Sequence, residues 1–223
     1  TYGSTIDIGA YERSNADASP EIQVRNGSTD IASGTTISIG SVVVGQTGKT
    51  VTIRIANTGN ATLMLSAPFA STSHFTVSQP STFNVAAGSF VDFTITLKTD
   101  AIWSGTETVT FKCNDADEST FTIRVAGTVT PTPANISIAC DTTPVTNGAT
   151  VSYGNPYEGT TVTKTFTIMN TGGTALNLDA KSFVNTSHFT VTAPTSLTVA
   201  ANSSLTFTVR FNTDTAGSYN DAI

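Results

Sequence analysis

The sequence predicts an all-β protein made of two tandem β-sandwich domains, of which the second lacks its last strands. Three observations lead to this prediction. Apolar and polar residues alternate in short segments, a long block of sequence recurs after 114 residues, and the second copy of that block stops early. A repeat of this length is typical of tandem domains, because the units of a solenoid run to only about 20–50 residues.

Short matching segments define the repeat and the domain boundaries. The matches pair residues 57–59 (Asn-Thr-Gly) with 170–172, 73–77 (Ser-His-Phe-Thr-Val) with 187–191, and 85–87 (Val-Ala-Ala) with 199–201. They divide the chain into a leader and linker at 1–19, a first domain at 20–129, a Pro/Thr linker at 130–133 and a second domain at 134–223. The spaced prolines of the second linker favour an extended, semi-stiff connection.

Within each repeat, apolar side chains occupy every second position. The clearest runs are Val51, Ile53 and Ile55; Phe93, Ile95 and Leu97; Phe121, Ile123 and Val125; Phe166 and Ile168; and Phe207, Val209 and Phe211. Such alternation describes a strand with one buried face and one face in water. Turn-forming residues separate the runs, at 57–60, 87–89, 114–117 and 170–173. About seven short strands in about 110 residues is the pattern of an immunoglobulin-like sandwich.

The order of these segments resembles a known family. The series comprises residues 20–24 (Pro-Glu-Ile-Gln-Val), 55–59 (Ile-Ala-Asn-Thr-Gly), 74–77 (His-Phe-Thr-Val), 85–89 (Val-Ala-Ala-Gly-Ser), 114–118 (Asn-Asp-Ala-Asp-Glu) and 121–128 (Phe-Thr-Ile-Arg-Val-Ala-Gly-Thr). It resembles the choice-of-anchor D repeats of bacterial surface proteins, which are relatives of the abnormal-spindle and hydin-type immunoglobulin-like domains. The resemblance covers both repeats and implies an extracellular, non-enzymatic β-sandwich. The leader around Ile6–Glu12 resembles the segment that often ends right-handed β-helix domains.

The second copy is expected to be incomplete. Asp100 aligns with Asp214, and only nine residues follow Asp214. The second domain should therefore lack part of its penultimate strand and all of its last one. One explanation is that the sequence is a piece of a longer chain. The other is that a neighbour donates the missing strand. The leader offers Ile6, Ile8 and Ala10 as a candidate donor, and head-to-tail donation would build a homopolymer.

Composition narrows the possible partners. The net charge is −6, which argues against nucleic acid, because phosphate binding needs clustered Lys and Arg. No apolar run approaches the roughly 20 residues that a membrane-spanning helix needs. The cysteines Cys113 and Cys140 lie at non-equivalent repeat positions and should be buried in separate domains, which disfavours a disulfide.

The histidines and acidic residues of the sequence do not form a pattern that is typical of a catalytic or metal site. The histidines His74 and His188 are equivalent by repeat and are interpreted as structural residues at strand starts, and no catalytic residue or cofactor is predicted. Asn114, Asp115 and Asp117, with Glu118, crowd a predicted hairpin turn. Their oxygen atoms offer a weak Ca²⁺ candidate, although Asn and Asp are also ordinary turn residues.

Surface sites are equally open to two interpretations. Trp103 is predicted in a loop, either exposed as a platform for a sugar or a partner, or packed at the end of the sandwich. Thr142 and Thr215 follow aspartates in short sequences that resemble bacterial O-glycosylation sites, so a glycan is a possible partner. The family resemblance therefore implies a structural module of a bacterial cell-surface protein, acting as a stalk, spacer or assembly unit. The alternatives are a filament subunit that polymerises by strand donation, and an adhesive or carbohydrate-binding accessory module of a larger adhesin or enzyme.

Overall fold

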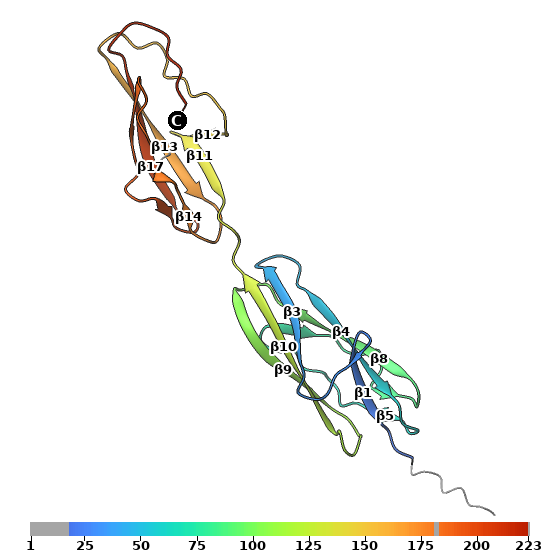
Figure 1. Ribbon diagram of the computed structural model, residues 1–223. Coiled ribbons are helices and arrows are strands. Elements are labelled where there is room, and N and C mark those ends of the chain that lie inside the picture. Colours follow the sequence, from blue (N-terminus) through green and yellow to red (C-terminus); the bar gives the residue numbers. More distant parts are fainter. Residues whose placement is uncertain (1–17, 181–182, 223) are drawn as a thin grey trace, which may run out of the picture. The chain divides into compact units, whose positions relative to one another are not determined.

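The computed structural model describes residues 18–180 and 183–222. The chain divides into two compact units, unit 1 and unit 2, at the boundary between Thr130 and Pro131. Both units consist of strands joined by turns and loops (Figure 1), and the described residues contain no α-helix. The predicted all-β fold is confirmed. The candidate donor residues Ile6, Ile8 and Ala10 lie outside the described residues.

Seventeen strands are defined in these residues. Unit 1 contains β1 (Ile22–Asn26), β2 (Thr29–Asp30), β3 (Thr36–Val43), β4 (Thr50–Asn57), β5 (Leu63–Met64), β6 (Phe75–Val77), β7 (Asn84–Val85), β8 (Phe90–Leu97), β9 (Trp103–Lys112) and β10 (Thr120–Thr130). Unit 2 contains β11 (Ile136–Cys140), β12 (Thr143–Val145), β13 (Thr161–Asn170), β14 (Leu176–Asn177), β15 (Phe189–Thr192), β16 (Thr198–Val199) and β17 (Ser204–Asn212). No helix of the described residues has the length and apolar character needed to cross a membrane.

Unit 1 is a sandwich of two sheets. One sheet has the order β2-β1-β4-β8-β6, and the other has the order β3-β10-β9 (Figure 1). The short pair β5-β7 extends the second sheet, because an isolated bridge joins Leu65 to Cys113 just beyond the end of β9. Trp103, which the sequence pattern placed in a loop, is the first residue of β9.

The period of two produces the core of unit 1. Ile53 and Ile55 on β4 and Phe93 and Ile95 on β8 are all at most 1% exposed. The intervening positions face solvent, where threonine hydroxyls pair across the strands. β-branched and aromatic residues suit this half-buried surface, so local preference and burial favour the same structure.

Strand β10 is the centre of the second sheet. It runs parallel to β3 and antiparallel to β9, and Gly127 lies beside Gly40 on one neighbour and Gly105 on the other. A Cβ added to Gly127 would lie 3.1 Å from the side chain of Leu97 on the opposite sheet. The absence of a side chain at Gly127 therefore lets the two sheets approach closely.

Unit 2 repeats only part of this architecture. Its five-stranded sheet, β12-β11-β13-β17-β15, corresponds to the first sheet of unit 1, and the pair β14-β16 corresponds to β5-β7. Among the described residues of unit 2, no strand corresponds to β3, β9 or β10. Residues 150–157, which precede β13 as β3 precedes β4, form no strand. The sheet that the last strands would build is absent from this part of the chain, as the sequence predicts.

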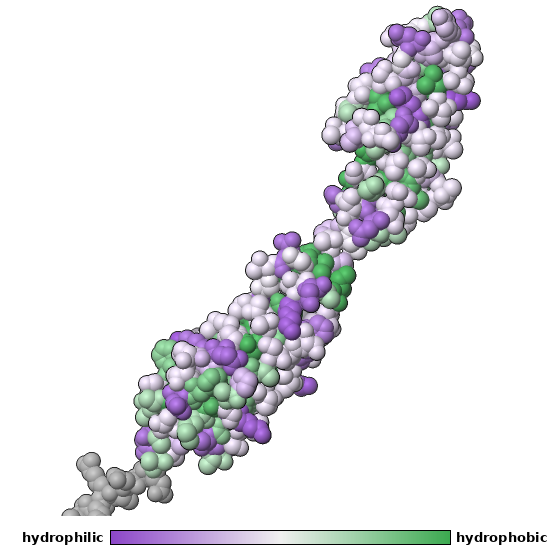
Figure 2. Space-filling view, turned by 180° about the vertical axis from the view of Figure 1, so that it is seen from behind, coloured by the Kyte–Doolittle hydropathy of each residue, from purple (hydrophilic) through white to green (hydrophobic). Residues whose placement is uncertain are grey.

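The uncovered sheet leaves part of the unit 2 core open. Phe166 on β13 and Phe207 on β17 stack with ring centroids 5.0 Å apart, yet both are only half-buried. Their counterparts in unit 1, Ile53 and Phe93, are 0% and 1% exposed. The space-filling view in Figure 2 shows a surface that is mostly polar or of intermediate hydropathy, with apolar residues in small groups.

Candidate functional site

A buried asparagine joins three segments of unit 1. Asn57 ends β4 and is 1% exposed. Its Nδ2 donates to the carbonyl oxygens of Ala61 (2.7 Å) and Val85 (2.9 Å). Its Oδ1 accepts from the backbone N–H of Gly59 (3.1 Å) and of Glu21 (3.3 Å). The amide is therefore fully used, and it fixes the following turn, β7 and the entering chain to one another.

The same arrangement recurs in unit 2. Asn170 ends β13 and is 0% exposed. Its Nδ2 donates to the carbonyl oxygens of Thr174 (2.7 Å) and Val199 (3.1 Å). Its Oδ1 accepts from the backbone N–H of Gly172 (3.0 Å) and Asn135 (3.1 Å). Each unit thus holds the segment that leads into it through one repeated Asn-Thr-Gly motif, which we call the Asn junction.

The glycine of each Asn junction lies directly under the entering chain. A Cβ added to Gly59 would collide with the backbone of Ser19 and Glu21, and one added to Gly172 would collide with the carbonyl of Pro133. In unit 2 the neighbouring Gly173 donates its backbone N–H to the carbonyl oxygen of Thr132 at 3.0 Å. The motif therefore needs glycine because a backbone passes at contact distance.

The linker between the units is bonded on both sides, each side within its own unit. In unit 1, the Thr130 carbonyl accepts from Val44 N–H at 2.8 Å, and the Thr130 hydroxyl donates to the Val42 carbonyl at 3.3 Å. In unit 2, Thr132 is held by Gly173, as described above. Only Pro131 lies between these two anchored residues.

Each histidine is clamped by an aromatic ring and a carboxylate. In unit 1, the His74 imidazole stacks on Trp103 with centroids 4.2 Å apart and planes inclined by 10°. His74 Nδ1 lies 2.6 Å from Glu107 Oε1, and the His74 backbone N–H donates to Glu107 Oε2 at 3.0 Å. Trp103 and Glu107 both belong to β9, so the clamp joins the start of β6 to the neighbouring sheet. The structural interpretation of His74 agrees with this geometry.

The corresponding clamp in unit 2 is looser. His188 stacks on Tyr219, with centroids 3.8 Å apart. The nearest approach of its Nδ1 to Asp221 Oδ2 is 3.5 Å, which is too long for a good hydrogen bond, and Nδ1 has no hydrogen-bond partner in the described chain. The Asp221 carboxylate instead accepts from the Thr186 hydroxyl at 2.6 Å. This bond is the main cause that holds the pKa of Asp221 below its ordinary value.

The predicted Ca²⁺ ligands do not all meet. Asn114 points to a neighbouring strand, where its Oδ1 accepts from Met64 N–H (2.7 Å) and its Nδ2 donates to the Thr62 carbonyl (3.1 Å). This side chain therefore serves to pin β5 beside the β9-β10 hairpin. Sequence reasoning counted it among the cation ligands because the turn pattern does not show which strand lies beside the hairpin.

The aspartates of that hairpin approach a residue that the sequence pattern did not single out. One carboxylate oxygen each from Glu21, Asp115 and Asp117 lie within 4.8 Å of one another. Asp115 is 2% exposed and already accepts from the Ile22 N–H at 2.8 Å. Burial, together with these neighbouring charges, raises the pKa of Glu118. Asp115 thus ties the hairpin to β1, and calcium binding there stays a prediction.

The remaining predicted positions lie at the surface or in the core. Thr142 and Thr215 are both exposed, and the Thr215 hydroxyl lies 2.7 Å from the Tyr219 hydroxyl. Glycosylation at either position stays a prediction. Cys113 and Cys140 are free thiols, and burial raises the pKa of each. A raised pKa leaves a thiol protonated and therefore weakly nucleophilic near neutral pH.

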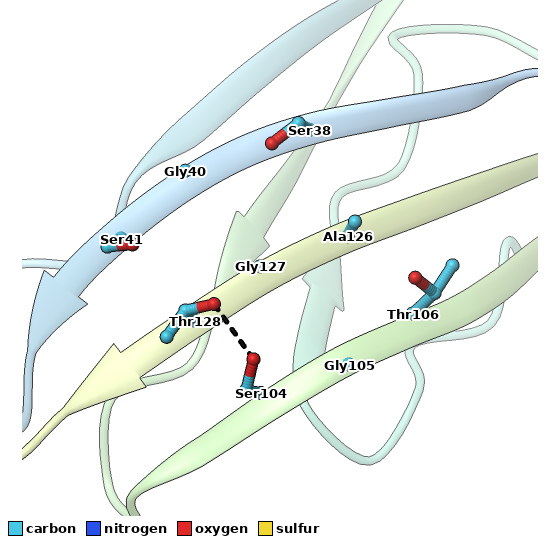
Figure 3. A pocket seen from close by; sticks show the side chains of 9 residues that line it. All are labelled: Ser38, Gly40, Ser41, Ser104, Gly105, Thr106, Ala126, Gly127 and Thr128. Carbon is cyan, nitrogen blue, oxygen red and sulfur yellow. Dashed lines mark hydrogen bonds between the residues drawn. The ribbon is translucent and has the colours of Figure 1, made fainter.

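A shallow hollow lies on the outer face of the β3-β10-β9 sheet (Figure 3). Its volume is about 330 Å³. The lining is made of glycine, alanine, serine and threonine, and the Ser104 and Thr128 hydroxyls are 3.0 Å apart, as the dashed line in Figure 3 marks. The short side chains of Ser104, Ala126 and Thr128 explain the hollow, because none of the residues that line it carries a long side chain.

Comparisons with solved structures give distant likenesses. A protein of unknown function from Porphyromonas gingivalis is 11% identical with a TM-score of 0.36, and the match covers 86% of this chain and 83% of that one. The seventh PapD-like (ASH) domain of human CEP192 is 12% identical with a TM-score of 0.36, covering 57% of this chain and 97% of that one. The secreted serine protease VesC of Vibrio cholerae is 10% identical with a TM-score of 0.34, covering 88% of this chain and 47% of that one. Among curated protein sequences, none matches the chain.

The sequence model of one domain family matches both units. It is described as the HYDIN/CFA65/VesB-like immunoglobulin-like domain, and it matches residues 32–128 and 148–223. The two matched segments correspond to the two sandwiches and together span most of the chain. The hydin-type part of the resemblance drawn from the sequence is therefore confirmed. The chain belongs to the HYDIN/CFA65/VesB-like immunoglobulin-like domain family.

Proposed function

We propose that this chain is a non-catalytic structural module of a bacterial extracellular or cell-surface protein, of the choice-of-anchor D kind, where it serves as a stiff spacer. The observation that carries the proposal is the linker. Thr130 is bonded to unit 1 and Thr132 to unit 2, so that only Pro131 separates two anchored residues. A proline has a fixed φ, and a joint of one such residue leaves little freedom for bending.

The stiffness of the joint can be measured by ¹⁵N relaxation of the backbone amides. If the joint is stiff, the amides of both units report one common rotational correlation time. A Gly-Ser-Gly-Ser insertion between Pro131 and Thr132 should separate the two correlation times. The same insertion between Asn147 and Gly148, in the loop after β12, is the matched control and should leave them equal. Two different correlation times in the unaltered chain would contradict the spacer proposal.

A second candidate function is assembly by strand donation, and the open sheet of unit 2 favours it. The half-buried Phe166 and Phe207 face a region where unit 1 has its β3-β10-β9 sheet. A strand from a second copy would cover these rings and could pair with residues 150–157, which form no strand in unit 2. The alternating Ile6, Ile8 and Ala10 of the leader supply such a strand, and head-to-tail donation makes the product a filament.

Light scattering and electron microscopy test this second candidate. The comparison is between the chain and a variant without residues 1–17, which retains Ser19 and its bonds to the turn after β4. Filaments or oligomers that disappear with the leader would support donation. A monomer in both cases would leave the spacer function alone. The same measurements can be made on a longer chain that continues past Ile223. If that chain is a monomer and its unit 2 is more stable, the polypeptide completes its own sheet.

The adhesive or carbohydrate-binding alternative receives less support. It relied on Trp103 as an exposed platform, but the indole is only partly exposed, with His74 stacked on one face and Phe75 in edge contact. A sugar would have to displace His74 to stack there. The ring instead contributes to the clamp that holds the start of β6 against β9.

A further inference from the structure

The inner face of the unit 2 sheet carries a lysine where unit 1 has valine. On β13 the residues that face the core are Val162, Lys164, Phe166 and Ile168, which alternate with exposed or partly exposed polar residues. Lys164 lies beside Val209 in the sheet register, whereas in unit 1 Val51 lies beside Ile95 at the same level. An apolar position of the repeat has therefore become cationic in the unit whose sheet is uncovered.

Lys164 has no anionic partner in the described part of unit 2. None of the salt bridges found among residues 18–180 and 183–222 includes it. Its Nζ lies 5.7 Å from the ring centroid of Tyr153, which takes the place of Ile39 and, like Ile39, precedes a glycine with positive φ. The other titratable neighbours are Cys140, whose pKa burial raises although the charge of Lys164 acts against this rise, and Asp141, whose carboxylate is exposed. A half-buried ammonium is costly to leave unpaired when a strand covers it.

Unit 1 shows which end of a covering strand would reach this lysine. β10 runs parallel to β3 and ends at Thr130, whose carbonyl accepts from Val44. Only a short turn separates Val44 from the start of β4 at Thr50. Gly127 on β10 packs against Leu97, the last residue of β8, which lies beside the start of β4. The carboxyl-terminal residues of β10 therefore lie at the end of the sandwich where β4 begins. Lys164 is close to the start of β13 at the equivalent end of unit 2.

The leader has a matching distribution of side chains. Ile6, Ile8, Ala10 and Glu12 occupy alternate positions and would share one face of a strand. On β10 the inward residues end with the small Gly127 followed by Val129, and on the leader the small Ala10 is followed by Glu12. Glu12 of the leader thus stands where the covering strand β10 has Val129. Lys164 stands where the covered sheet of unit 1 has Val51.

We propose that Glu12 of a second copy pairs with Lys164 and sets the direction and register of the donated strand. This inference rests on the strand-donation candidate and names the chemistry of its occupant. The leader enters unit 2 parallel to residues 150–157, in the place that β10 has in unit 1. Ile6, Ile8 and Ala10 then cover Phe166 and Phe207, and Glu12 arrives at the end that holds Lys164. An antiparallel strand would carry Glu12 to the opposite end and leave both charges unpaired.

Charge reversal of each partner tests the pair. Sedimentation velocity would give the association constant of the chain, of Lys164→Glu, of Glu12→Lys and of the variant with both changes. We expect each single reversal to weaken leader-dependent association by about tenfold or more, and the double reversal to restore most of it. Lys112→Glu, an exposed lysine on β9, makes the same change of net charge and should have no effect. Lys164→Met, which keeps the packing volume, distinguishes lost charge from misfolding of unit 2.

The outcomes separate the pair from the donation itself. If the leader is needed for association but the double reversal does not restore it, the Glu12–Lys164 pair is overturned and strand donation stands. If deletion of residues 1–17 does not change the association state, both proposals are overturned. If a longer chain that continues past Ile223 is monomeric and its unit 2 excludes the leader, the occupant is the chain itself, which overturns both as well.

Discussion

At the scale of single residues, the Asn junction fixes the chain that enters each unit. Asn57 and Asn170 are the side chains that connect the end of a central strand to the chain entering each unit. A buried amide must satisfy two donors and its acceptor oxygen, and both residues do so entirely with backbone groups. The sequence pattern marked these residues only as turn formers, because Asn-Gly segments are common in turns and burial is not visible in a turn pattern.

Replacement of Asn57 tests the junction. Asn57→Ala removes two donated bonds and leaves the Glu21 and Gly59 N–H groups without their acceptor. We expect a loss of about 2–3 kcal/mol in the free energy of unfolding of unit 1, because buried unsatisfied groups carry the full cost of desolvation. Urea unfolding followed by Trp103 fluorescence measures it. Asn84→Ala, at an exposed position on β7, is the control and should change the free energy by less than about 0.5 kcal/mol.

The His74–Glu107 clamp predicts a pH dependence in unit 1. Burial alone raises the pKa of Glu107, but hydrogen bonds from Thr72 and His74 and the charge of the imidazole outweigh it, so the folded pKa lies below its ordinary value of 4.5. A lowered folded pKa means that the contribution is complete above the unfolded pKa and is lost as the pH falls through the folded pKa. Glu107→Gln should therefore lower the Tm of unit 1 at about pH 7 and have a smaller effect at about pH 3.

Thermal unfolding followed by circular dichroism at both pH values measures this difference. Glu158→Gln, which removes an exposed carboxylate from unit 2, is the matched control and should leave the Tm of unit 1 unchanged at both pH values. An effect of Glu107→Gln that is the same at both pH values would mean that the side chain acts through packing and not through its charge.

At the scale of elements, the connection into each unit depends on glycine. The entering chain crosses the turn of the Asn junction at contact distance, and a Cβ at Gly172 would meet backbone atoms of Pro133, Ala134 and Asn135. Backbone atoms cannot move aside as a flexible side chain can. The first strand of the unit, β11, would therefore have to shift against β13, whose register it shares over five residues.

Gly172→Ala tests this connection. We expect unit 2 to lose about 1–3 kcal/mol of stability, since overpacking against backbone forces a shift of the chain. Hydrogen exchange of the β11 and β13 amides measures the change at the affected strands. Thr195→Ala, in an exposed loop of the same unit, should leave that exchange unchanged. If Thr195→Ala also speeds amide exchange throughout unit 2, the measurement reports the low stability of the whole unit and not the contact at Gly172.

At the scale of the whole molecule, the two units differ in how completely their cores are covered. Ile53 and Phe93 are at most 1% exposed in unit 1, whereas their counterparts in unit 2, Phe166 and Phe207, are only half-buried. Apolar area removed from water contributes about 25 cal/mol per Å², so unit 2 alone has the weaker driving force for folding. The completed state of unit 2 therefore depends on a strand that the described residues do not supply.

The chain should accordingly unfold in two steps. Trp103, its only tryptophan, belongs to unit 1, so indole fluorescence reports on that unit alone. Circular dichroism reports on both units. We expect circular dichroism to show an earlier transition, at least about 10 °C below the one seen by fluorescence, because a domain of this size shifts by about 4–8 °C per kcal/mol. A single transition that is shared by both signals would contradict the idea that unit 2 is less stable by itself.

The sequence by itself determined the fold class, the two-domain organisation and the face of each long strand. Alternation decides these features, because a side chain on a strand can point only to one face or the other. The sequence also indicated that the second copy is incomplete, since its alignment with the first runs out after Asp214. These are properties of local order along the chain.

The tertiary structure alone decided which distant residues meet. Glu107 contacts His74 across 33 positions, Ile22 donates its backbone N–H to Asp115 across 93 positions, and Trp103 lies in β9 instead of the expected loop. Each of these pairings depends on which strands become neighbours and in what register, and that is decided by the packing of two sheets. The same reason applies to Lys164. The alternation of residues places it on the inner face of β13, but only the structure shows that this face of the sheet is uncovered.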